Sequence, residues 1–122
     1  YTVTRTIYST PVLVFSEDFY NKSTWTEVDV SLHVSLSAKV VHCTYSMVNR
    51  GFNARMGFNV ALNSSGGQGM LAGSAGRMGK VIDCGGQFVA RLDRSTRKFW
   101  IQSTASTTDI GPLTIMVYAY GD

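Results

Sequence analysis

The stretch "PLTIMVYAYG", residues 112–121, alternates between two kinds of side chain along its whole length. In an extended chain, one side would carry four apolar residues: Leu113, Ile115, Val117 and Ala119. The opposite side would carry Thr114, Met116, Tyr118 and Tyr120. Successive side chains of a strand point to opposite faces of a sheet, so a period of two indicates a strand with one buried face. The segment therefore predicts a half-buried β-strand.

The same period recurs in "WTEVDVSLHV" (25–34), "ARMGFNVAL" (54–62) and "QFVARLD" (87–93). The inward residues would be Val28, Val30, Leu32, Val34, Ala54, Met56, Phe58, Val60, Leu62, Phe88, Ala90 and Leu92. Further strands are predicted near 2–8, 11–15, 38–48, 79–84 and 97–103, and no segment shows a helical period. Strands at a spacing of about ten residues predict an all-β domain, an antiparallel β-sandwich resembling a jelly roll.

Two connections stand out between the predicted strands. The stretch from 63 to 79 holds six glycines and no strand signal, so it is expected to be a flexible connection at one end of the sandwich. Asp93–Thr96 separates two alternating runs and is predicted to be a hairpin loop of about four residues.

Length and composition bound the class of protein. The chain has 122 residues, 44% hydrophobic and 16% charged, which fits one globular domain spanning residues 1–122. It lacks an apolar run long enough to span a membrane, so membrane insertion is not expected. A net charge of +3 is low for a duplex-binding module, so no nucleic-acid partner is expected. Because the chain starts without Met or an apolar signal core, we expect a piece of a longer protein or a mature product.

Chemistry-bearing residues are sparse. Cys43 and Cys84 are expected to be buried free thiols, with a single disulfide between them as the alternative. Neither belongs to a CxxC motif, so neither a metal site nor a cofactor is predicted. Asp29, Ser31 and His33 resemble a triad only superficially, because alternate residues stand about 7 Å apart along a strand. With the other acids scattered, no catalytic residues are predicted, and the chain is expected not to be an enzyme.

The stretch "DRSTRKFWIQ", residues 93–102, supplies the candidate binding residues. If Phe99 and Ile101 join the core, Trp100 points outward among basic neighbours, where it should meet a sugar ring or another subunit. Arginine side chains nearby could pair with the carboxylate of an acidic sugar. The candidate ligand-binding residues are Trp100, Arg97, Lys98, Arg91 and, in another loop, Asn53.

The order of segments over residues 25–121 resembles the C-terminal receptor-binding domains of bacteriophage tail fibres and tailspikes. The resemblance is carried by "WTEVDVS", "LSAKVVHCTYSM", "ARMGFNVAL", a glycine-rich connection, "GQFVARLDRSTRKFWIQST" and the closing "LTIMVYAYGD". The same arrangement is used by carbohydrate-binding domains appended to polysaccharide-degrading enzymes.

This resemblance implies a homotrimer at the tip of a virion fibre that attaches to a cell-surface polysaccharide without catalysis. It also favours free thiols, because phage structural proteins fold in a reducing cytoplasm. Two alternatives stay open. One is a structural module that trimerises or caps a fibre and binds no ligand, and the other is an extracellular carbohydrate-binding domain of an enzyme. A glycan-processing activity is disfavoured by the scattered acids.

Overall fold

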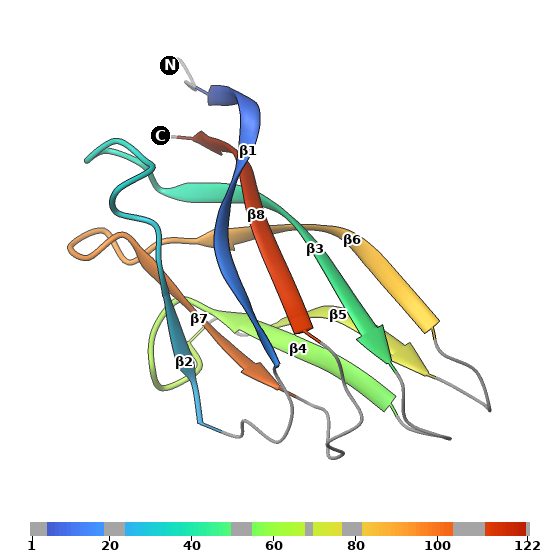
Figure 1. Cartoon of the computed structure of the whole chain (residues 1–122). Helices are drawn as coiled ribbons and strands as arrows, with labels where there is room; N and C mark the ends of the chain where they lie inside the picture. Colours follow the sequence, from blue (N-terminus) through green and yellow to red (C-terminus); the bar gives the residue numbers. More distant parts are fainter. Residues whose placement is uncertain are drawn as a thin grey trace.

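The computed structural model describes residues 5–18, 24–49, 55–67, 70–76, 82–103 and 112–121. These residues form two facing layers of strands (Figure 1). The strands are β1 (Arg5–Asp18), β2 (Thr26–Asp29), β3 (Val40–Asn49), β4 (Arg55–Ala61), β5 (Met70–Gly76), β6 (Ile82–Arg91), β7 (Lys98–Ser103) and β8 (Pro112–Gly121).

Each layer is a four-stranded antiparallel sheet. One has the order β1-β8-β3-β6 and the other the order β2-β7-β4-β5. Every connection except that between β4 and β5 crosses from one sheet to the other, which is the winding of an eight-stranded jelly roll. The predicted fold class, an all-β antiparallel sandwich, is confirmed.

The core lies between the inner faces of the two sheets, where the alternating residues meet. Leu113, Ile115 and Val117 of β8 belong to the core, as predicted. The alternation then shifts: the register with β3 is irregular after Val117, so Ala119, although buried, pairs with the outward His42, and Tyr120 packs against the core instead. Buried residues of the other predicted inward set are Val28, Val30, Val34, Phe58, Val60, Phe88, Ala90 and Leu92. The centre is aromatic: the rings of Phe58 and Phe88 meet edge to face at 5.5 Å, and those of Phe88 and Phe99 at 6.1 Å.

The predicted strand over 25–34 is wrong in its second half. β2 ends at Asp29, and the chain then turns, so Leu32 is 93% exposed rather than inward. The cause is local: Asp29 Oδ1 accepts a hydrogen bond from the Ser31 N–H at 2.8 Å, which bends the backbone away from the ladder. The His33 N–H then bonds to the Val30 carbonyl at 2.9 Å. The expected row of Asp29, Ser31 and His33 on one strand face therefore does not form.

The glycine-rich stretch is also more ordered than predicted, because it contains strand β5, "MLAGSAG". Its backbone pairs with β4 from Arg55 opposite Gly76 to Val60 opposite Met70. Small residues give no contrast between faces, so the sequence pattern carries no strand signal even though the backbone forms a ladder. The predicted strands near 2–8 and 11–15 are one strand, β1, whose register with β8 shifts between Ile7 and Val12.

The connection over 92–97 turns as predicted but does not join paired strands. The Asp93 N–H bonds to the Lys98 carbonyl at 3.0 Å, and the Arg97 N–H bonds to the Asp93 carbonyl at 2.7 Å. Beyond this turn the chains separate, because β6 and β7 belong to different sheets. The hairpin interpretation is therefore wrong, and the segment links the two layers at one end of the sandwich.

The register of β3 against β6 answers the question of a Cys43–Cys84 disulfide. Cys43 lies opposite Phe88, whereas Cys84 lies opposite Met47, four residues further along β3. Four residues of strand span about 13 Å, and disulfides join Cα atoms less than about 7 Å apart. Cys43 is a buried free thiol, and burial raises its pKa to about 12.

We expect Cys43 to resist alkylation in the folded protein. Its raised pKa keeps the thiol neutral, and thiolate is the form that reacts. In a Cys84→Ala background, iodoacetamide at pH 8.5 should leave Cys43 unmodified for hours and should label it within minutes in urea, as read by mass spectrometry. Rapid labelling without denaturant would show that solvent reaches the core around Cys43.

Candidate functional site

Trp100 lies in the middle of the sheet β2-β7-β4-β5, on its outer face. It stands opposite Glu27 of β2 and opposite Ala61 of β4. Its neighbours Phe99 and Ile101 are completely buried in the core, so the indole points the other way and is half-buried. The outward direction predicted for Trp100 is confirmed, although its part in binding stays a prediction.

A second tryptophan, Trp25, shares this face and was not assigned to the site from sequence. Thr26 stands opposite Ile101 in the β2–β7 ladder, so Trp25 precedes an inward position and falls on the outer side with Glu27. Gly66 approaches the ring so closely that a Cβ there would lie 3.0 Å from the indole. The loop over 62–67 therefore packs against Trp25 and fixes one side of it. The alternation of residues 25–29 is the signal that could have located it.

Amide side chains accompany the two indoles. Asn59 of β4 stands opposite Gln102 of β7, and Asn59 Nδ2 lies 3.5 Å from Gln102 Oε1. Both flank inward residues of the core, so both lie on the outer face with the indoles. We call Trp25, Asn59, Trp100 and Gln102 the tryptophan face. It combines flat apolar rings with groups that both donate and accept hydrogen bonds.

Arg97 and Lys98, the predicted basic residues next to Trp100, both make contacts within the molecule. Arg97 Nη1 donates to the Ser31 carbonyl at 2.9 Å and to the Val34 carbonyl at 3.2 Å, which ties the turn after β2 to the start of β7. Arg97 also has a left-handed backbone, with φ at 56°. Lys98 Nζ donates a hydrogen bond to Glu27 Oε2 at 2.7 Å, and this bond raises the pKa of Lys98. The geometry gives both residues structural contacts beside Trp100.

We expect Arg97→Ala to lower the free energy of unfolding by about 1–3 kcal/mol, because it leaves two partly buried carbonyls without their charged donor. Arg94→Ala, an exposed arginine of the same turn, is the matched control and should change stability by less than about 0.5 kcal/mol. Urea unfolding of the two variants measures the difference. Equal stabilities would mean that the Arg97 contacts are dispensable.

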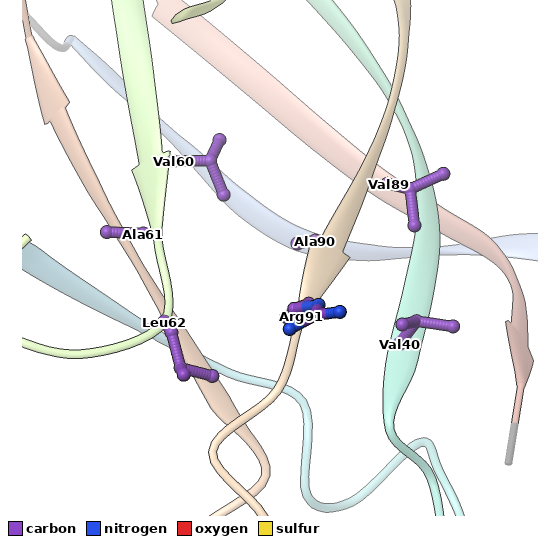
Figure 2. Close-up of a pocket in the computed structure, with 7 residues that line it drawn as sticks. All are labelled: Val40, Val60, Ala61, Leu62, Val89, Ala90 and Arg91. Carbon is purple, nitrogen blue, oxygen red and sulfur yellow. The ribbon is translucent and has the colours of Figure 1, made fainter. Parts of the chain in front are cut away.

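Arg91 lies apart from this group, at a depression between the two sheets. A cavity of about 290 Å³ is lined by Val60, Ala61 and Leu62 from β4 and its loop, and by Val40, Val89, Ala90 and Arg91 from the facing sheet (Figure 2). A second cavity, of about 450 Å³, adjoins it because both are lined by Val40, Leu62 and Arg91. The second one is completed by Lys39, Leu92 and Arg94. We call the two together the basic hollow.

The remaining predicted site residue, Asn53, lies outside the described residues, so its grouping with the others stays a prediction. Among the residues that the structure describes, no cluster of three or more His, Cys, Asp or Glu side chains is arranged to hold a metal ion. In the same part of the chain, no helix has the length and hydropathy needed to cross a membrane.

Comparisons with known proteins yield similarity in solved structures only. No protein-family profile matches the sequence, and no curated protein matches it significantly. The chain is similar to the CBM22-1 xylan-binding domain of Paenibacillus barcinonensis Xyn10C, with 10% identity, a TM-score of 0.41 and coverage of 93% of this chain and 96% of that one.

Two further solved structures show likenesses of the same order. Murine APRIL has 11% identity and a TM-score of 0.45, covering 95% of this chain and 97% of its own. The carbohydrate-binding module CBM6cm-2 of Cellvibrio mixtus lichenase 5A, in complex with cellotriose, has 12% identity and a TM-score of 0.37, covering 96% and 95%. At such low identities and TM-scores, no property of these proteins is transferred to this chain.

Proposed function

We propose that this protein is a non-enzymatic glycan-binding domain that holds a cell-surface polysaccharide against its tryptophan face. The observation that carries the proposal is the presence of two half-buried indoles, Trp25 and Trp100, on the outer face of one sheet beside Asn59 and Gln102. Exposing the apolar surface of a large aromatic ring to water costs free energy, which a bound ligand would recover. Aromatic rings beside a few polar groups are typical of ligand-binding sites.

The chemistry of a sugar matches this surface. A pyranose ring has an apolar C–H face, which stacks on an indole, and a rim of hydroxyl groups, which exchange hydrogen bonds with amides. Trp25 directly precedes β2, and Trp100 lies on the neighbouring strand β7. Paired strands lie about 4.8 Å apart, so two successive sugar units of a chain could contact the two indoles in turn. Each contact is weak, and repeated copies of the domain on one particle would add them through multivalency.

For the biological setting, we propose host attachment at the tip of a phage tail fibre or tailspike, with the domain assembled as a homotrimer. The support is the order of segments over residues 25–121 described above. An extracellular carbohydrate-binding domain of a polysaccharide-degrading enzyme would use the same face in the same way.

A glycan array tests the proposal directly. The labelled protein, clustered on streptavidin to supply multivalency, should bind at least one class of bacterial surface polysaccharide above background. A clustered Trp25→Ala/Trp100→Ala double variant that is folded by circular dichroism serves as the control. Failure of the parent protein to bind any polysaccharide on a broad bacterial array would contradict the proposed function.

A second candidate function, a structural module that joins subunits, is favoured by the outer face of the other sheet. Ile7 is 66% exposed and Leu13 is 54% exposed on β1, and Val89 is 43% exposed on β6. In the paired register, Ile7, Ala119, His42 and Val89 form one row across the four strands. An apolar sheet face of this kind suits contact with further copies of the chain.

We expect light scattering to give three times the 13.3 kDa mass of the chain at micromolar concentration. Leu13→Glu should shift the protein toward monomer, because a charge would be buried in the contact. Ser64→Glu, an exposed residue of the loop over 62–67, is the control and should leave the mass unchanged. A monomeric parent protein would contradict the trimer and remove the support for the structural module.

A further inference from the structure

We infer that the basic hollow is a subsite for the carboxylate of an acidic sugar, so that the glycan recognised is anionic. The inference rests on the proposed function and narrows its ligand to one chemical class. It starts from the lining of the hollow, in which the three charged residues, Lys39, Arg91 and Arg94, are all cations.

Backbone pairing holds Lys39 and Arg91 beside one another at the hollow. Val40 stands opposite Arg91 in the β3–β6 ladder, and the Leu92 N–H extends the pairing by bonding to the Lys39 carbonyl at 2.9 Å. The Lys39 N–H in turn bonds to the Gly121 carbonyl at 2.8 Å. Binding therefore needs little rearrangement of the backbone, which lowers its entropic cost.

The electrostatics of the hollow favour an anion. Among the described residues, none with an acidic side chain lines either cavity. Asp93 is next to Leu92 in sequence, yet its carboxylate accepts hydrogen bonds from the Ser95 N–H at 2.9 Å and the Ser95 hydroxyl at 2.6 Å. Those bonds lower the pKa of Asp93 and direct its charge to the turn. Concentrated positive charge over low-dielectric walls attracts an anionic group.

The walls identify what kind of anion fits. Val40, Val60 and Leu62 give the hollow an apolar side, which a bare inorganic anion does not use. A sugar acid has both parts, a ring with an apolar face and a carboxylate that an arginine can bind with two hydrogen bonds. The larger cavity, about 450 Å³, lies within the ~300–1,000 Å³ of small-ligand sites. A nucleic acid would need a longer basic field with interleaved aromatics.

The hollow adjoins the tryptophan face. Ala61 lines the smaller cavity and stands opposite Trp100 in the β4–β7 ladder. A polysaccharide that extends from Trp100 across Ala61 therefore meets the rim of the hollow. The two features form one extended site, in which the indoles hold the sugar rings and the hollow selects those that carry a carboxylate.

Titration of the isotopically labelled protein with single acidic sugars tests the inference. The probes are glucuronate, galacturonate and N-acetylneuraminate, each beside its methyl ester, and inorganic phosphate. At least one acid should shift the backbone amides of Lys39, Val40 and residues 91–94, and its methyl ester should not. No such shifts with any of the three acids, equal shifts with the esters, or equal shifts with phosphate would overturn it.

Variants make the test residue-specific. The double variant Arg91→Gln/Arg94→Gln should raise the dissociation constant of the responding acid by about tenfold or more, because charge-assisted hydrogen bonds are lost. Arg5→Gln is the matched control, because Arg5 lies on β1, three strands from β6 and thus about 14 Å away. An equal loss of affinity in Arg5→Gln would mean that the effect comes from the overall charge of the protein, which would contradict the subsite. The subsite and the proposed function can fail separately. If the protein binds the array, the tryptophan double variant does not, and none of the acids shifts the amides at the hollow, the subsite is refuted and the proposed function stands.

Discussion

Phe58→Ala is expected to lower the free energy of unfolding by about 3–5 kcal/mol. The side chain is completely buried, and its ring meets Tyr45 at 5.1 Å and Phe88 at 5.5 Å, both edge to face. Its removal leaves a cavity between the two sheets and interrupts the aromatic centre of the core. Since a small domain is stable by only about 5–15 kcal/mol, the variant should unfold at a much lower urea concentration.

The matched control is Leu36→Ala, a large apolar residue that is 82% exposed. Its effect should stay within about 0.5 kcal/mol, because it removes little buried surface. Equal losses in the two variants would mean that the sheets do not pack through Phe58. If Phe58→Ala fails to fold, Phe58→Leu gives a smaller cavity and should still cost more than the control.

Trp100→Ala is expected to weaken binding of a responding polysaccharide by about thirtyfold or more, which corresponds to about 2 kcal/mol. The indole is half-buried on the outer face and makes no part of the core between the sheets, so the fold should survive. Isothermal titration with the parent and variant proteins measures the loss, and thermal unfolding checks the fold.

Tyr118→Ala is the control for this variant. Tyr118 is also a half-buried aromatic residue, but it lies on β8 of the other sheet, where its ring stands 6.0 Å from His42. Its replacement should leave glycan affinity within about twofold. Should Tyr118→Ala abolish binding while Trp100→Ala does not, the binding face would be the sheet β1-β8-β3-β6.

The parts of the fold that sequence could predict are those with a strong contrast between alternate residues. β8 alternates Leu113, Ile115 and Val117 with polar or larger residues, and all three are buried. β5 was not predicted, because its glycine, alanine and serine residues offer no such contrast and the strand depends on backbone pairing with β4. The end of β2 depends on one side chain, Asp29, whose bond to the Ser31 N–H overrides an apolar alternation that continues to Val34.

In the site, too, features set by neighbouring residues could be predicted, whereas contacts between residues far apart in sequence could not. The outward direction of Trp100 followed from its position between two core residues. The partners of Arg97 and Lys98 could not be predicted, because Ser31, Val34 and Glu27 are 66, 63 and 71 residues away in sequence. The basic hollow likewise needs the folded ladder, which brings Lys39 beside residues 91–94.

The central claim, that a glycan binds across Trp25 and Trp100, is tested most directly by the indole N–H resonances of the labelled protein. Each tryptophan gives one side-chain signal, and the chain has only these two. Titration with an oligosaccharide of a polysaccharide that responds on the array should shift both signals with a single dissociation constant. Saturable binding that moves neither indole signal would place the ligand elsewhere and contradict the account.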